Sequence, residues 1–113
     1  MIVKSRDPRE LTIDLLPRSI CAVQVAAVLA DNHGIFSWGT NHVGFDGMGC
    51  HAEREAIRKA NRRRLEGSTI YVASVRHRNG KAINSRPCSA CQSLIVKWGI
   101  KAVYRGGDEV WYG

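Results

Sequence analysis

The sequence lacks any long apolar run. No stretch approaches the roughly 20 consecutive apolar residues that a helix needs to cross a bilayer, and the start, Met1 to Asp7, lacks the apolar core of a secretory signal. We therefore expect a cytoplasmic protein with no membrane partner. Internal repeats, low-complexity tracts and linker-like segments are also missing, which indicates one continuous domain over residues 1–113.

Acidic residues are scarce relative to basic ones. Ten Asp and Glu residues stand against 17 Lys and Arg residues, so the formal net charge is +7. Such a surface attracts anions, whether nucleotides, nucleic acid or acidic proteins, without indicating which. Much of the charge lies in one run, which is more typical of a solvated helix face than of a strand-binding surface. Its members are Arg54, Arg58, Lys59, Arg62, Arg63 and Arg64.

The hydrophobic pattern predicts an α/β layered fold with a mixed sheet. We expect helices over Asp7–Leu16, His51 to about Leu65 and Cys88–Trp98, and strands over Ile20–Leu29, Ile35–Trp38, Thr69–Val75, Ile100–Tyr104 and Glu109–Tyr112. The glycine-rich segment Gly39–Cys50 reads as an irregular loop. The link between the fourth and fifth strands is too short for a parallel crossover, so these strands should pair antiparallel.

Four cysteines allow more than one interpretation. Cys21, Cys50, Cys88 and Cys91 are enough for two disulfides. However, Cys88 and Cys91 form a C-x-x-C pair, and in a reducing compartment such a pair is more often a metal or redox site.

His51, Cys88 and Cys91 together supply one imidazole and two thiolates, a ligand set that suits Zn²⁺. Cysteines three residues apart in a helix share one face, and the positive end of the helix dipole favours their thiolate form. Three protein ligands leave the fourth tetrahedral position open, as in catalytic zinc sites, where zinc lowers the pKa of water to about 7. Glu53, two residues after the histidine, is the candidate for moving the water proton.

Less specific interpretations remain open. A structural zinc site would need a fourth ligand, for which Cys50 or Cys21 is available. His33, His42 and His77 have no partners at ligand spacing, so we expect them to be ordinary loop residues.

The segments His51-Ala52-Glu53 and Pro87 to Cys91 resemble the H-x-E and P-C-x-x-C signature of the cytidine deaminase-like superfamily of zinc deaminases. The resemblance extends from about Ile20 to Tyr112. It implies a three-layer α/β fold whose five-stranded mixed sheet carries helices on both faces. It also implies a zinc ion on His51, Cys88 and Cys91, with Glu53 as proton shuttle, and assembly as a homo-oligomer.

The same resemblance implies several substrate contacts. Asn41 matches an asparagine that contacts the sugar or base, and the Ala52 amide would bind the base carbonyl. The backbone carbonyl of Ser85 would face the leaving amine. Phe36 and Trp38 are candidates for aromatic walls around the base, although aromatic side chains more often fill cores.

An antiparallel last strand is similar to that of deaminases of free cytidine and deoxycytidine. The first ligand is a histidine, however, where typical deaminases of free nucleosides carry cysteine. Residues Ile83–Tyr104, with the turn Gly99-Ile100-Lys101, are more similar to small virus- or phage-type deoxycytidylate deaminase-like proteins. The leading hypothesis is therefore conversion of a free cytosine nucleoside or nucleotide to the uracil form, with Arg76, Arg78 and Arg86 as candidate phosphate contacts. The alternatives are a single-stranded DNA or RNA cytosine deaminase and a non-catalytic zinc module that binds nucleic acid.

Overall fold

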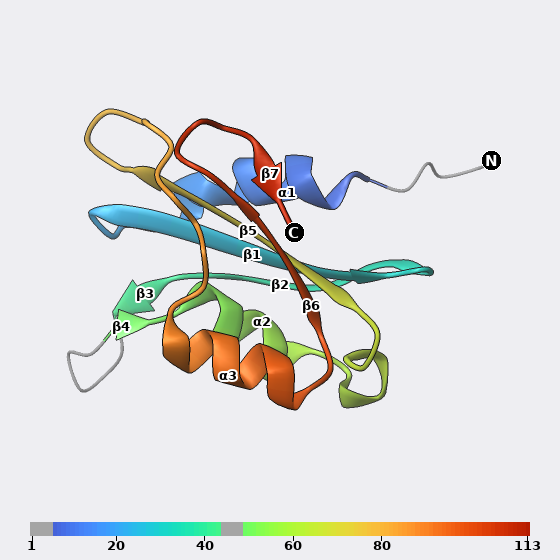
Figure 1. The fold of residues 1–113 in the computed structure, drawn as a ribbon. Coiled ribbons are helices and arrows are strands. Elements are labelled where there is room, and N and C mark those ends of the chain that lie inside the picture. The colour runs from blue at the N-terminus through green and yellow to red at the C-terminus, as the bar shows by residue number, and fades with distance from the viewer. Residues whose placement is uncertain (1–5, 44–48) are drawn as a thin grey trace.

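A mixed sheet forms the centre of the structure (Figure 1). The computed structural model describes residues 6–43 and 49–113. The strand order is β2-β1-β5-β6-β7. These strands are β1 (Val23–Asp31), β2 (Gly34–Thr40), β5 (Thr69–Arg76), β6 (Lys101–Arg105) and β7 (Trp111–Tyr112), and a separate pair is formed by β3 (His42–Val43) and β4 (Gly49–Cys50).

The strand directions agree with the sequence prediction. Strand β1 pairs antiparallel with both β2 and β5, whereas β5 and β6 are parallel. Strands β6 and β7 pair antiparallel, with Tyr104 opposite Tyr112. The predicted antiparallel pairing of the last two strands is therefore confirmed, and the sheet is mixed.

Helices cover both faces of the sheet (Figure 1). On one face lies α1 (Pro8–Leu15), followed by the 3₁₀ turn η1 (Leu16–Arg18). On the other face α2 (Ala52–Lys59) and α3 (Ser89–Lys97) lie side by side. None of the helices within the described part of the chain is long and apolar enough to span a membrane.

The central strand is buried on both sides, as its apolar sequence predicts. Ala27 and Leu29 belong to the core cluster beneath α2 and α3, whereas Ala26 and Val28 pack with α1. The predicted start of the strand at Ile20 is wrong. The chain turns before Val23 because polar bonds of Ser19 hold it there, and the Ile20 side chain is 84% exposed.

The second predicted helix is shorter than expected. It ends at Lys59 because Ala60 is extended, and the Asn61 side chain accepts a hydrogen bond from the Arg63 N–H. That bond opens the 3₁₀ turn η2 (Arg62–Arg64). Asn side chains compete in this way with helical backbone bonds, so the prediction of a continuous helix to Leu65 is wrong.

The segment predicted as a loop from Gly39 to Cys50 is partly strand. Gly39 lies near the end of β2, and the short strands β3 and β4 flank the residues outside the described part. A Cβ atom at Gly39 would lie 2.7 Å from the Ala52 carbonyl oxygen and 2.8 Å from the Ala56 nitrogen. The absence of a side chain therefore lets β2 approach α2 closely, which sets the position of the N-terminus of that helix.

Candidate active site

The starts of α2 and α3 bring three metal-ligating side chains together. His51 is the N-cap of α2, Cys88 is the N-cap of α3, and Cys91 lies in the first turn of α3. The His51 Nδ1 atom lies 3.2 Å from Cys91 Sγ and 3.4 Å from Cys88 Sγ. The three ligand atoms lie within 4.8 Å of one another, and this is the one such group found within the described part of the chain.

This geometry fits a zinc ion. Zinc–sulfur and zinc–nitrogen bonds of about 2.3 and 2.0 Å place ligand atoms roughly 3.5 Å apart at tetrahedral angles, close to the nitrogen–sulfur distances found here. Burial raises the pKa of the Cys91 thiol, and the negative charge of Glu53 raises it further. A metal ion binds cysteine as the thiolate. Its positive charge would offset the free-energy cost of deprotonating Cys91 at this buried position.

The donor set has no fourth member within the described residues. The Cys21 Sγ atom lies instead against the Asn41 carbonyl oxygen, at 3.8 Å. The Cys50 side chain falls outside the described part. Cys21, Cys88 and Cys91 are not joined by a disulfide, so the disulfide interpretation is wrong for these three.

Glu53 lies beside the cluster, in the first turn of α2. Its side chain is buried, and this burial raises the pKa of the carboxyl group above its ordinary value. A backbone hydrogen bond, the electrostatic influence of His51 and a hydrogen bond with Cys91 act in the opposite direction. A carboxyl group whose pKa is raised in this way is better suited to accepting and returning a proton than an exposed carboxylate.

A cavity of about 230 Å³ opens at this point. Six of the residues predicted for the site line it, namely Asn41, His51, Ala52, Glu53, Ser85 and Arg86. The remaining lining residues are not among those predicted from the sequence. They are Val23, Val25, Ser74, Ile83 and Asn84. These residues come from strands β1 and β5 and the loop after β5, where no motif marks them.

Comparison with known proteins identifies the family. Residues 12–106 match the family described as the cytidine and deoxycytidylate deaminase zinc-binding region. The chain belongs to this deaminase family. A search of the curated proteins gave no match.

Solved structures show that the family's fold is present. A cytidine deaminase from Burkholderia pseudomallei superposes with a TM-score of 0.69 at 21% identity, over 94% of this chain and 89% of the other. A dCMP deaminase from the cyanophage S-TIM5 gives a TM-score of 0.59 at 19% identity, with coverages of 87% and 82%. RibD from Acinetobacter baumannii gives 0.64 at 22% identity, covering 88% of this chain and 27% of RibD. The predicted three-layer deaminase fold is confirmed.

Ser85, which lines the cavity, is held in place by hydrogen bonds. Its hydroxyl group shares a 2.8 Å hydrogen bond with the Ser74 hydroxyl, and its N–H donates to the Arg105 carbonyl oxygen at 2.9 Å. The Asn84 side chain accepts from the Arg86 N–H at 3.0 Å. These bonds fix the backbone that leads to Pro87 and the cysteine pair.

The two aromatic candidates, Phe36 and Trp38, do not line this cavity. Phe36 is partly buried against the core beneath α2 and α3, with the Arg64 guanidinium 4.4 Å from its ring centroid. Trp38 is 43% exposed, with Lys59 Nζ 5.7 Å from its ring centroid. A role as walls of this cavity is therefore wrong for both, because β2 directs them elsewhere, and the core interpretation holds for Phe36.

The remaining histidines do not belong to the cluster of His51, Cys88 and Cys91. The prediction that they are loop residues is confirmed for His33 and His77, whereas His42 begins strand β3. His33 and His77 are exposed, in the turn after β1 and after β5 respectively. His42 Nε2 lies 3.8 Å from a carboxylate oxygen of Glu55.

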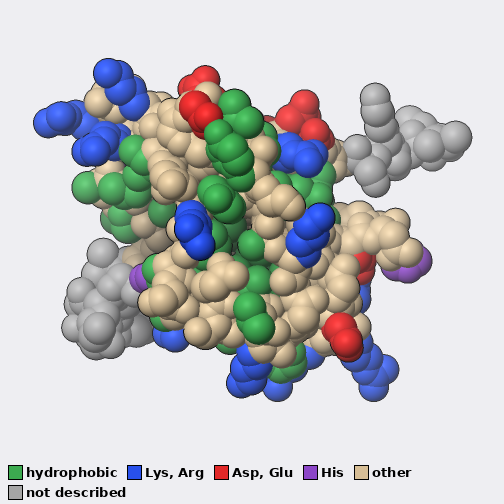
Figure 2. Space-filling view, in the orientation of Figure 1, with side chains coloured by type: hydrophobic (Ala, Val, Ile, Leu, Met, Phe, Trp, Pro, Cys, Tyr) green, Lys and Arg blue, Asp and Glu red, His purple; other side chains and the backbone are tan. Residues whose placement is uncertain are grey.

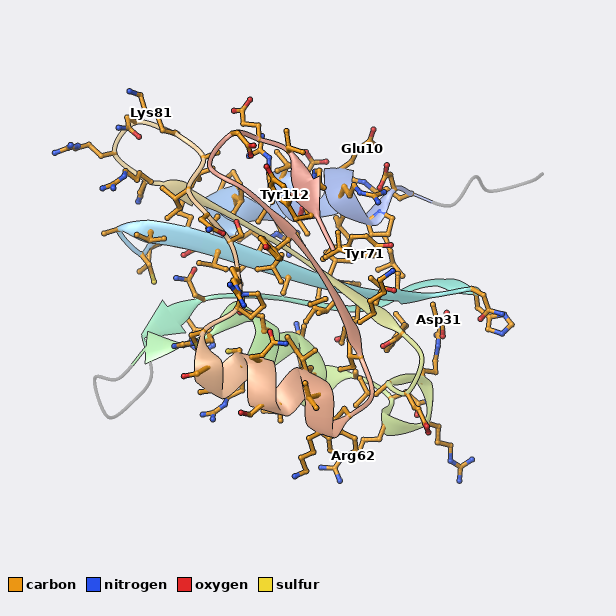
Figure 3. All side chains as sticks on the ribbon, in the orientation of Figure 1. Glu10, Asp31, Arg62, Tyr71, Lys81 and Tyr112 are labelled. Carbon is orange, nitrogen blue, oxygen red and sulfur yellow. The ribbon has the colours of Figure 1, made fainter. Side chains whose placement is uncertain are left out.

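The arginine-rich run spans α2 and the turn after it. Arg54 lies in the first turn of α2, whereas Arg62, Arg63 and Arg64 follow its C-terminus, at the opposite end from His51. Eight helical residues separate the two ends by about 12 Å, with His51 before α2 and Arg62 after it. Arg64 makes two hydrogen bonds with Asp31, at 2.7 and 2.8 Å, and Arg62 lies over the Trp98 ring. Figure 3 shows Arg62 and Asp31 toward the C-terminal end of α2, and Figure 2 shows Lys and Arg side chains at several separate places on the visible face, with one group close together at the upper left.

Proposed function

We propose that this protein catalyses the zinc-dependent hydrolytic deamination of a cytosine base, in a free nucleoside or nucleotide, to the uracil form. The observation that carries this proposal is that Glu53 and His51 line one cavity, while His51 also forms a cluster of potential metal ligands with Cys88 and Cys91. His51, Cys88 and Cys91 would hold the zinc ion. Zinc bound there supplies Lewis-acid activation of water at neutral pH.

Glu53 is the proposed proton carrier. Its carboxylate takes a proton from water as the oxygen bonds to C4 of the base, and passes that proton to the ring nitrogen. It then takes the second proton and gives it to the exocyclic amine, so that the C4–N bond breaks and ammonia leaves. The raised pKa of this buried carboxyl group favours its return to the protonated form in each cycle.

Three groups of the chain are proposed to position the base. The Ala52 N–H lies in the first turn of α2, where backbone N–H groups lack intrahelical partners, and it can donate to the base carbonyl. The Ser85 carbonyl oxygen would accept from the leaving amine. Asn41, which also lines the cavity, would contact the sugar or base.

Arg86 is the proposed phosphate contact. It is exposed and, among the residues that the structure describes, it is the one Lys or Arg that lines the cavity. A cavity of about 230 Å³ is below the 300–1,000 Å³ common for ligand pockets. We infer that the base enters it while the sugar and any phosphate lie at the rim beside Arg86.

Free substrates are favoured over a polynucleotide by the position of the basic run. Arg62 and its neighbours follow the C-terminus of α2, whereas the cavity lies at its N-terminus. A strand held by Arg62, Arg63 and Arg64 would therefore lie away from the cavity, and Arg54 is the one member of the run in the first turn of α2.

Assembly as a homo-oligomer is also proposed. Ile20 is 84% exposed, and Val23, on the cavity wall, is 39% exposed. A second copy of the chain covering these side chains would remove apolar surface from water. Light scattering tests this point, and the mass of a monomer at all concentrations would contradict it.

The deciding experiment is a substrate panel run on protein of measured zinc content. Cytidine, deoxycytidine, CMP, dCMP and a cytosine oligonucleotide are incubated separately, and products are separated by chromatography. We expect a uracil product from at least one of the four small substrates. Conversion of the oligonucleotide alone would indicate a polynucleotide deaminase. Salt-sensitive oligonucleotide binding that persists in Glu53→Ala, with no deamination, would indicate a non-catalytic zinc module.

A further inference from the structure

The Asn41 carboxamide is fixed by three hydrogen bonds. Its Oδ1 atom accepts from the Val25 N–H at 2.8 Å and from the Ser19 hydroxyl at 2.7 Å, and its Nδ2 atom donates to the Val23 carbonyl oxygen at 2.7 Å. A backbone N–H can only donate and a carbonyl oxygen can only accept. The direction in which the carboxamide lies is therefore determined by the backbone of β1.

Ser19 is itself held in place. Its hydroxyl oxygen accepts from the Cys21 N–H at 3.3 Å, which leaves the hydroxyl proton for Asn41. Its carbonyl oxygen accepts from Gln24 Nε2 at 2.7 Å, and both Ser19 and Gln24 are buried. Ser19 thus links the turn before β1 to the cavity wall.

These hydrogen bonds determine which side-chain group of Asn41 is available to bind a ligand. Both lone pairs of Oδ1 are used, and one hydrogen of Nδ2 is used. The second Nδ2 hydrogen has no partner among the residues that the structure describes, and Asn41 lines the cavity. Asn41 therefore offers one N–H donor to the cavity and no free acceptor.

We infer that Ser19 is a positioning residue of this site, which with the β1 backbone locks Asn41 as a donor for an oxygen acceptor of the ligand. The inference rests on the proposed function in one respect. It takes from that function the identity of the ligand, a cytosine nucleoside or nucleotide. A base or sugar oxygen matches the free N–H. An exocyclic amine turned toward Asn41 would place two donors against each other, so Asn41 disfavours the reversed orientation of the base.

Steady-state kinetics test the role of Ser19. In Ser19→Ala we expect KM for the best small substrate to rise about two- to tenfold, the range for one neutral hydrogen bond, with kcat near the native value. Ser68→Ala is the matched control, because Ser68 is also fully buried and its hydroxyl donates to the Leu65 carbonyl oxygen at 2.6 Å, away from the cavity. KM should be unchanged in the control. An unchanged KM in Ser19→Ala, or a loss confined to kcat, would overturn the inference.

A second measurement does not depend on turnover. The ¹⁵N NMR signal of the Asn41 side-chain amide should report a rigid NH₂ group in the native protein, with one proton slow to exchange and the other shifted by added CMP. In Ser19→Ala, or in Ser19→Cys if the alanine variant does not fold, that rigidity should fall. Equal rigidity in both proteins, or no shift with saturating CMP, would refute the Ser19–Asn41 inference. Absence of turnover with every substrate would refute the proposed function alone.

Discussion

The Nδ1 atom of His51 lies 3.2 Å from the Sγ atom of Cys91, although 40 positions separate them in the sequence. The two residues meet because α2 and α3 run side by side beneath the sheet and begin at the same end of it (Figure 1). First-turn positions in both helices place the ligands where helix dipoles favour negative charge. Metal binding and the stability of the two helices are therefore linked.

Removal of either cysteine should remove the metal. Cys88→Ala and Cys91→Ala are each expected to lose stoichiometric zinc and to unfold at lower temperature, because metal binding contributes directly to folding stability. Cys21→Ala is the control, since its Sγ atom lies outside the cluster. Elemental analysis and thermal unfolding check this. Retention of one zinc per chain in either cluster variant would show that the site lies elsewhere.

Replacement of Glu53 should lower turnover without removing the bound zinc. Glu53→Gln is expected to keep zinc and the fold but to lower kcat by about 10²- to 10⁴-fold, the usual contribution of a general acid–base group. Glu55→Gln is the control on the same helix, because Glu55 forms an ion pair with Arg58 and does not line the cavity. Full activity of Glu53→Gln would eliminate Glu53 as proton carrier.

Arg86 should distinguish nucleotides from nucleosides. In Arg86→Gln we expect KM for CMP or dCMP to rise about tenfold, as for one exposed charge-assisted hydrogen bond, with KM for cytidine and deoxycytidine little changed. Arg78→Gln serves as control, because Arg78 is exposed but does not line the cavity. Equal effects on nucleosides and nucleotides would argue against a phosphate contact.

The Asp31–Arg64 ion pair should make the free energy of unfolding depend on pH in the acidic range. The Arg64 guanidinium, through its hydrogen bonds, lowers the pKa of Asp31 to about 2 from its ordinary value of 3.8. Because the folded-state value is the lower one, the stabilisation is complete above the ordinary pKa and is lost as pH falls toward 2. The difference in free energy of unfolding between native protein and Asp31→Asn should therefore shrink between about pH 4 and pH 2. Urea unfolding at several pH values measures it, and a constant difference would be inconsistent with the pair.

The amino-acid sequence alone predicts those parts of the site that depend on local spacing. Cys88 and Cys91 share a helix face through their separation, and Glu53 follows His51 within one turn, so the spacing itself indicates that each pair acts together. The walls of the cavity depend on strand register instead. Ser74 reaches the cavity because it pairs with Val25 across β1 and β5, and no short-range pattern encodes that pairing.

In the fold, too, some features follow from local sequence patterns and others do not. The buried central strand and the antiparallel last pair follow from apolar runs and connection length. The end of α2 does not, because apolar periodicity continues to Ala60 while the single side-chain bond of Asn61 stops the helix. The start of β1 differs from the prediction for a similar reason, since Ser19 holds a turn within an apolar sequence.

X-ray absorption at the zinc edge tests the central claim most directly, because it counts the ligands of the ion. The account predicts one zinc per chain with two sulfur ligands at about 2.3 Å and lighter nitrogen or oxygen ligands at about 2.0 Å. A third sulfur ligand would mean a site closed by another cysteine, and protein without zinc would mean no such site. Either result would contradict a hydrolytic deaminase with an open coordination position.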